Sequence, residues 1–153
     1  MKQLIVILIV CLSTVCYAEE SFLDRHEISI GYAPFAKHFN ADDKDYNETV
    51  NAIFLSMDQW FIGTFKNSHY DQTVAGGYNF RTPKWKPLKN NFFLRANLYL
   101  GLMYGYDDNL ANVGGISFAV APTIEIGYKN ISLDTMAIPV DGGVISTMIK
   151  WTF

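Results

Sequence analysis

The stretch "NFFLRANLYLGLMYG" at residues 91–105 decides the fold, because its side chains alternate between two kinds with a period of two. Every even-numbered position from 92 to 102 is apolar, whereas the positions between them include Arg95, Asn97 and Gly101. A helix would mix these two sets around its axis, but a strand separates them onto opposite faces. The stretch is therefore predicted to be a long β-strand with one apolar face and one mixed face.

Similar alternation predicts further strands along the chain and gives an even total, which is typical of an antiparallel up-and-down β-barrel. Two tight turns, at 58–59 and 129–130, and a longer one at 82–90 would lie at one end of this barrel. Longer segments rich in Asp, Asn and Gly would lie at the other end. The eight predicted strands are 26–34, 50–57, 60–66, 73–81, 91–104, 116–128, 131–138 and 144–153.

The direction in which the apolar face points separates two kinds of barrel. A soluble barrel of the lipocalin type would turn the leucines inward, whereas a membrane barrel would turn them toward lipid. The mixed face carries small residues that suit a narrow lumen, and the C-terminal "ISTMIKWTF" (145–153) resembles the recognition signal of bacterial outer-membrane barrels. We therefore predict an eight-stranded antiparallel transmembrane β-barrel in the outer membrane, monomeric, with extracellular loops and a periplasmic C-terminus.

The N-terminal segment 1–18 has the pattern of a cleaved signal peptide, with a positive start, an apolar run and small residues near Ala18. Residues 19–153 are then predicted to form a single barrel domain. Both cysteines, Cys11 and Cys16, fall in the signal segment, so the remaining chain has no thiol. The formal net charge is −3 and no basic stripe is present, which argues against nucleic acid as a partner. Three scattered histidines do not predict a metal site, and no cofactor is expected.

Prolines interrupt the predicted barrel wall. Proline has no N–H to donate to a neighbouring strand, so membrane strands usually exclude it. Pro122 lies inside the sixth predicted strand, whereas Pro34 and Pro139 lie at strand ends. If Pro139 lies across from Pro122, the wall lacks pairing there, and a lipid chain would be able to enter through this gate. Pro34 is the third candidate gate residue.

The segment "PTIEIGYKNISLDTMAIP" (122–139) resembles part of the lipid A palmitoyltransferase family, PagP, in which two prolines flank a Gly-Tyr pair at a lateral gate. The resemblance continues in "FAKHFNADDKDYNE" (35–48), "FKNS" (65–68) and "AGGY" (75–78). It implies a short relative of the family that moves an acyl chain from a phospholipid to lipid A or a similar outer-leaflet acceptor in lipopolysaccharide. The chain has only "EESFLDR" where enterobacterial members carry an amphipathic helix before the barrel.

Acyl transfer needs an activated hydroxyl, a base and donors for the developing oxyanion. Ser68 is the candidate hydroxyl, His38 or His69 the candidate base, and Asn67 with nearby amides the candidate donor. In the family, an Asp-Ser pair and a strand-end histidine carry this role. Ser68 matches the serine, Asn67 replaces the aspartate, and Tyr32 falls at the position of the histidine. We select His38, with His69 and Tyr32 as weaker candidates.

The resemblance also places a glycine after the Gly-Tyr pair at the floor of the acyl pocket. Here Gly77 and Tyr78 are followed by Asn79, which is expected to point into the lumen and to shorten the accepted chain below palmitoyl. Two other functions stay open at this point. One is a non-catalytic barrel of the OmpX type, whose loops bind partners or shield the surface. The other is a phospholipid or acyl hydrolase, which would use the same residues with water as acceptor.

Overall fold

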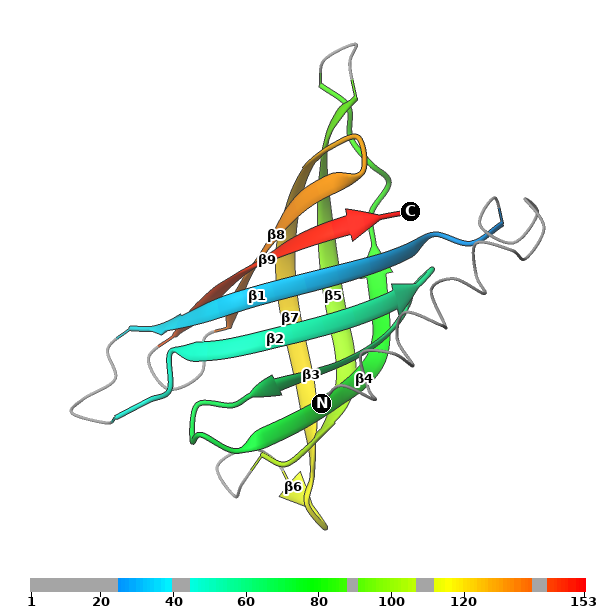
Figure 1. Cartoon of the computed structure of the whole chain (residues 1–153). Helices are drawn as coiled ribbons and strands as arrows, with labels where there is room; N and C mark the ends of the chain where they lie inside the picture. Colours follow the sequence, from blue (N-terminus) through cyan, green and yellow to red (C-terminus); the bar gives the residue numbers. More distant parts are fainter. Residues whose placement is uncertain (1–24, 40–44, 88–90, 107–111, 139–142) are drawn as a thin grey trace, which may run out of the picture.

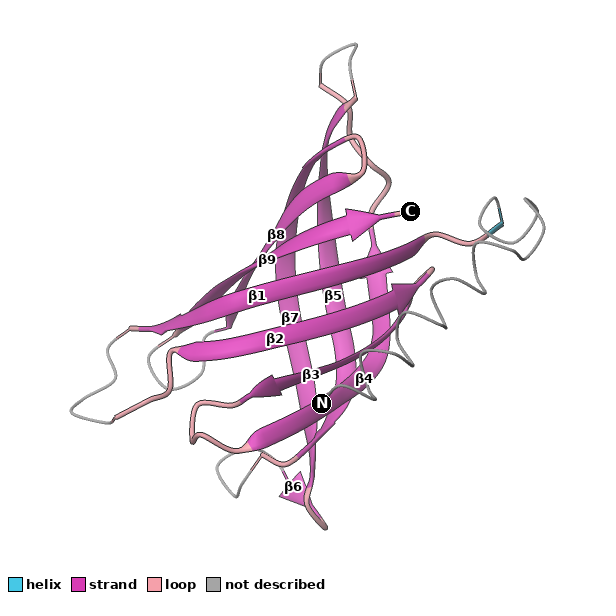
Figure 2. Ribbon diagram, viewed as in Figure 1, coloured by secondary structure: helices cyan, strands magenta, loops and turns pink. Residues whose placement is uncertain are grey.

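A computed structural model describes residues 25–39, 45–87, 91–106, 112–138 and 143–153, and almost all of the regular structure in them is β-strand (Figures 1 and 2). The predicted signal peptide at 1–18 lies outside the described residues. The strands are β1 (Ile28–His38), β2 (Thr49–Met57), β3 (Trp60–Lys66), β4 (Gln72–Arg81), β5 (Phe92–Tyr104), β6 (Asn112–Val113), β7 (Ile116–Tyr128), β8 (Ile131–Ile138) and β9 (Val144–Thr152).

The strands close into an eight-stranded antiparallel barrel, which confirms the predicted fold class. Each long strand pairs with the next along the chain, β9 pairs with β1, and β5 pairs directly with β7. The two-residue β6 only extends the loop before β7 through a turn at Gly114 and Gly115. In Figure 1, β1 and β2 cross the front of the barrel and β5 and β7 run behind them. The observed strand bounds lie close to the predicted ones except in β1, which continues four residues further.

The two ends of the barrel differ in their connections. At one end, called here the turn end, tight turns at 58–59 and 129–130 join β2 to β3 and β7 to β8. Asp58 and Lys129 adopt left-handed backbone conformations there, as such short hairpin turns require. At the other end, called the loop end, longer segments connect β1 to β2 and β5 to β7. We call the two corresponding halves of the interior the turn half and the loop half.

The outer surface of the barrel is apolar. Leucine, isoleucine, valine, phenylalanine and tryptophan side chains are exposed on all eight long strands. Buried side chains inside the barrel include Arg95, Asn97, Glu125, Asp134 and Lys150. This is the reverse of a soluble barrel and is compatible with a barrel that lies in a membrane. Within the described residues, no helix has the length and hydrophobicity needed to cross a membrane.

Candidate functional site

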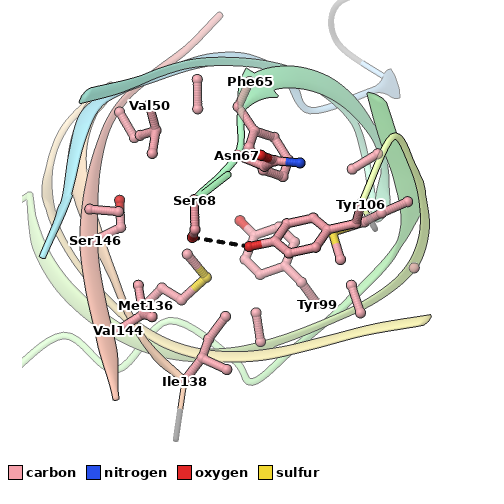
Figure 3. Close-up of a pocket in the computed structure, with 18 of the residues that line it drawn as sticks. Val50, Phe65, Asn67, Ser68, Tyr99, Tyr106, Met136, Ile138, Val144 and Ser146 are labelled. Carbon is pink, nitrogen blue, oxygen red and sulfur yellow. Dashed lines mark hydrogen bonds between the residues drawn. The ribbon is translucent and has the colours of Figure 1, made fainter. Parts of the chain in front are cut away.

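A cavity of about 430 Å³ occupies the loop half of the barrel (Figure 3). Side chains normally fill the lumen of an eight-stranded barrel, so a cavity requires small residues at inward positions. Here the inner wall carries alanines from β1, β2, β4 and β7, together with Gly101 from β5. The lining is mainly apolar. A space of this size and character suits part of an apolar ligand such as an acyl chain.

Two aromatic rings close the cavity toward the turn half. Phe61 and Tyr99 meet edge to face with their ring centroids 5.2 Å apart, and both line the cavity. The Tyr99 hydroxyl donates a hydrogen bond of 2.8 Å to Asp134, which also lies at this boundary. The cavity floor therefore consists of the packed Phe61 and Tyr99 rings, and the Asp134 carboxylate holds the Tyr99 hydroxyl in place.

The floor differs from the one predicted at Gly77, Tyr78 and Asn79. None of these three residues belongs to the described lining of the cavity. Tyr78 lies on the outer face, where its ring contacts Trp60. Asn79 is buried but sits beyond the floor, with its backbone N–H bonded to the carbonyl of Gln59 in the β2–β3 turn. In the described lining, Phe61 and Tyr99 hold the place expected for Asn79, and the effect of Asn79 on the acyl chain stays a prediction.

The turn half is filled by a buried ionic network rather than by a cavity. Glu125, only 1 % exposed, lies 2.6 Å from Arg95 Nη2 and 2.6 Å from Lys150 Nζ. It also accepts hydrogen bonds from Arg95 Nε and from the Ser132 hydroxyl. The alternation of β5 and β7 predicts that Arg95 and Glu125 meet inside the barrel, and the structure confirms this pair. Buried charges with this many partners form a rigid plug.

His38 and Ser68 meet at the rim of the cavity. His38 Nε2 and Ser68 Oγ are 2.9 Å apart, and both residues line the cavity. His38 is the last residue of β1, whereas Ser68 lies in the turn between β3 and β4. The structure therefore brings together the two residues selected from the sequence, although they are 30 positions apart. When His38 carries its proton on Nδ1, its Nε2 accepts the serine proton, which is the geometry that activates a hydroxyl.

A β-bulge at Pro34 places His38 inside the barrel. The register of β1 against both β2 and β9 shifts by one residue around Pro34, so the strand continues through it instead of ending there. Before the bulge Ala33 faces inward; after it Ala36 and His38 face inward. An uninterrupted alternation would have turned His38 toward the outer surface. The prediction that Pro34 ends the strand is therefore wrong, and the proline re-aims the histidine.

Asn67 holds the turn that carries Ser68. It is 1 % exposed, and its side-chain oxygen accepts hydrogen bonds from the backbone N–H groups of His69 and Asp71 at 2.9 and 3.0 Å. Its side-chain nitrogen donates to the carbonyl of Gly105 at 2.7 Å. This is the local side-chain pattern that stabilises tight turns. Asn67 lies beside the serine, and its side-chain hydrogen bonds hold the loop rather than point at a ligand.

Three aromatic side chains surround the His38–Ser68 pair. Tyr46 stacks on His38 with ring centroids 4.5 Å apart, and its ring also meets His69 edge to face. His69 in turn meets Tyr106 at 6.0 Å, and the Tyr106 hydroxyl lies 3.1 Å from Ser68 Oγ (Figure 3). Sequence reasoning identified His69 but missed Tyr46 and Tyr106. The only signal for them was their position in the two loops that share the rim with Ser68.

Tyr32 lies outside the site. Its side chain is 43 % exposed on the outer face of β1, and its hydroxyl donates to the Asn51 side chain at 2.8 Å. The structure therefore separates this weaker candidate from Ser68. His26, the third histidine, lies at the turn end beside Asp58. Among the described residues, no group of three or more histidine, aspartate or glutamate side chains is placed to hold a metal ion.

Among the described residues, the pairing between β7 and β8 stops in the loop half of the barrel wall. The ladder between these strands ends at Thr123 and Met136, next to Pro122, whereas the ladder between β5 and β7 continues past Pro122 to Ile116. Pro122 cannot donate a hydrogen bond, which explains why pairing stops there. Outward-facing Val120 also lines the cavity, so the cavity reaches this unpaired edge. Pro139, the second predicted gate residue, lies outside the described residues.

A comparison of the chain with models of known protein families found no match, and a comparison with curated proteins found none either.

Proposed function

We propose that this protein is an outer-membrane acyltransferase of the lipid A palmitoyltransferase type. It moves an acyl chain from a phospholipid to lipid A or a similar acceptor in the outer leaflet. The observation that carries the proposal is the His38–Ser68 hydrogen bond of 2.9 Å at the rim of an apolar cavity. A reactive hydroxyl and an acyl-sized cavity are the two parts that such an enzyme needs.

The apolar outer surface supports the membrane location. A continuous apolar band on the outside of a closed barrel requires lipid around it, and aromatic side chains gather at the ends of such bands. Trp60, Tyr128 and Trp151 are exposed at the turn end, and Phe35 and Tyr104 are exposed near the loop end. The loop end then faces the cell exterior, and the turn end with the C-terminal Phe153 faces the periplasm.

The gap between β7 and β8 supports lateral entry of the donor. A phospholipid in the surrounding leaflet keeps its acyl chains in the apolar layer, so a side entrance lets one chain slide into the cavity without crossing water. The cavity lining at the gap, Phe118, Val120 and Ile138, is apolar. Pro122 keeps the edge of β7 unpaired at this height. The chain would enter between β7 and β8 and extend toward Phe61.

The proposed reaction has two steps, acylation of Ser68 and transfer of the acyl group to the acceptor. The Ser68 oxygen bonds to the ester carbonyl carbon while its proton passes to His38 Nε2, and collapse of the tetrahedral intermediate breaks the bond to the glycerol oxygen. That oxygen takes the proton from His38 and leaves as a lysophospholipid. A hydroxyl of the acceptor then attacks the acyl-serine and passes its proton to His38, which returns it to Ser68 as the acyl bond breaks.

Mass spectrometry of lipid A and phospholipids tests the proposal. Cells expressing the wild-type protein should contain acylated acceptor and lysophospholipid, and Ser68→Ala should abolish both. His38→Ala should lower the rate by about 100- to 10,000-fold, as for the loss of a general base. Ser56→Ala is the matched control, because it removes a hydroxyl near the turn end, where Ser56 is bonded to Ser29.

Each outcome of this experiment assigns a class. Acylated acceptor that depends on Ser68 supports the transferase. Lysophospholipid and free fatty acid without an acylated acceptor indicate the hydrolase, with water taking the place of the acceptor. Unchanged lipids from a folded barrel in the outer membrane overturn the enzyme proposal and indicate a non-catalytic barrel whose loops bind partners.

A further inference from the structure

An acyl transfer at Ser68 creates negative charge on the carbonyl oxygen, and that charge needs a hydrogen-bond donor beside the serine. Backbone N–H groups usually supply such donors. Here four N–H groups of the turn around Ser68 are used within the turn itself. The N–H groups of His69 and Asp71 donate to the Asn67 side chain, that of Asn67 donates to Asp71, and that of Tyr70 donates to Asn67. The side-chain nitrogen of Asn67 donates to Gly105.

A different donor lies on the cavity side of the serine. The Tyr106 hydroxyl is 3.1 Å from Ser68 Oγ, and both residues line the cavity (Figure 3). When the serine proton points to His38, the serine oxygen accepts a hydrogen bond from the Tyr106 phenol. Ser68 then lies between a base, His38, and a hydrogen-bond donor, Tyr106.

The segment before Tyr106 holds the phenol in place. Gly105 adopts a φ of 95°, and a Cβ there would meet the carbonyl oxygen of Gln72, so this position favours glycine. The Gly105 carbonyl accepts hydrogen bonds from Asn67 and Thr73. Asn112 donates to the carbonyl of Tyr106 at 2.9 Å, and the His69 ring contacts the Tyr106 ring. Fixed orientation of this kind is what makes a donor effective in a transition state.

We propose that Tyr106 is a further catalytic residue, whose phenol stabilises the oxyanion formed when Ser68 is acylated and deacylated. This inference rests on the proposed acyl transfer. In the resting enzyme the phenol donates to the serine oxygen. As that oxygen bonds to the carbonyl carbon, the phenol shifts to the neighbouring carbonyl oxygen, where the electron pair of the broken π bond collects. The phenol keeps its proton throughout and donates only a hydrogen bond.

The test is steady-state kinetics of the full mature barrel in detergent micelles, with phosphatidylcholine as donor and lipid A as acceptor. Tyr106→Phe keeps the ring and its contact with His69 but removes the donor. Loss of one oxyanion donor should lower kcat by about 100- to 1,000-fold. KM for phosphatidylcholine should stay unchanged, because the interaction forms only as charge develops. Tyr104→Phe is the matched control, since Tyr104 is 66 % exposed on the outer face.

The outcomes separate this inference from the function on which it rests. A lower kcat with unchanged KM in Tyr106→Phe, and wild-type kinetics in Tyr104→Phe, support a catalytic phenol. Wild-type kcat in a folded Tyr106→Phe barrel overturns the inference and leaves the acyltransferase standing, as does a rise in KM alone. A wild-type protein that transfers no acyl chain overturns both. Circular dichroism and resistance of the barrel to unfolding in SDS at room temperature establish that each variant is folded.

Discussion

The two halves of the barrel interior have opposite chemistry, although the same eight strands form the wall of both. In the turn half, Arg95, Glu125 and Lys150 are each nearly inaccessible and satisfy one another. In the loop half, inward positions carry alanine and glycine, and a cavity of about 430 Å³ remains. The Phe61 and Tyr99 rings divide the two. In the turn half, the inward side chains make the barrel rigid. In the loop half, the inward side chains are small and leave space for a ligand.

This difference suggests a division of labour. Buried ion pairs fix a single arrangement of the strands, because any other register would leave a charge unpaired. The open half of the narrow barrel then keeps its shape with only a small apolar cluster of its own, formed around Ala33, Ala36, Val50 and Ala52. Variants of the turn half should therefore affect stability, whereas variants of the loop half should affect the reaction.

The largest expected effect is on the turn half. Glu125→Ala would leave the Arg95 and Lys150 charges buried without their shared carboxylate, and loss of one partner from a buried ionic group costs about 3–5 kcal/mol. Urea unfolding in detergent or lipid vesicles measures the change in the free energy of unfolding. Glu48→Ala removes a carboxylate from the exposed ion pair with Lys37 and should leave stability almost unchanged. Equal losses of unfolding free energy in Glu125→Ala and Glu48→Ala would contradict a stabilising role for the buried ionic network.

The next effect concerns the floor between the halves. Phe61→Leu should deepen the cavity and lengthen the preferred donor chain, at a cost of about 1 kcal/mol in stability. Mass spectrometry of the transferred chain, with phospholipids of several chain lengths as donors, measures it. Asn79→Gly is the matched variant beyond the floor and should leave the chain length unchanged. A longer chain in Asn79→Gly alone would restore the floor predicted from the sequence.

A smaller effect is expected at the side opening. Pro122→Ala restores an N–H and lets the β7–β8 ladder extend, which should slow acyl transfer. Stability should change by no more than about 1 kcal/mol, because the added hydrogen bond is offset by a more flexible unfolded chain. Pro83→Ala, in the β4–β5 connection at the turn end, serves as the control. An unchanged rate in Pro122→Ala would argue against entry between β7 and β8.

The smallest effect is a pH dependence at the edge of the plug. Burial raises the pKa of Glu27, but the charges of Arg81, Lys84 and Arg95 outweigh it and hold the pKa below its ordinary value of 4.5. The stabilisation is therefore present above pH 4.5 and is lost as the pH falls through the lowered pKa. Glu27→Gln should remove this acid-dependent part, less than about 1 kcal/mol. The free energies of unfolding of the wild type and of Glu27→Gln should therefore converge as the pH falls from 7 to 3. A constant difference between the two over this pH range would contradict the prediction.

Alternation along the strands was enough to predict most of the fold. Period-two patterning located the eight strands within a few residues and showed that Arg95 and Glu125 share the interior. These predictions work because the faces of a strand follow directly from residue parity. The loop-end residues Ser68 and His38 could be selected by their chemistry and their shared rim. The sequence did not give the distance between their side chains.

The parts that could not be predicted depend on local breaks in the pattern. The bulge at Pro34 reverses the parity of β1, so His38 faces inward against the rule that located the strands. Asn79 obeys parity and points inward, but parity does not give the height at which Phe61 and Tyr99 close the cavity. Tyr106 joins the site through a loop, where no periodic pattern exists.

The plug also fixes the route along which a guest molecule travels. In the proposed membrane location, the charged side chains buried in the turn half would make the cavity a blind pocket rather than a tunnel across the membrane. An acyl chain that enters with its tail first would leave by the rim or through the same side opening, with its tail last. Such a barrel would conduct no ions, and its chemistry would be confined to a single leaflet. The buried charges that stabilise the fold would thus also preserve the asymmetry of the membrane around it.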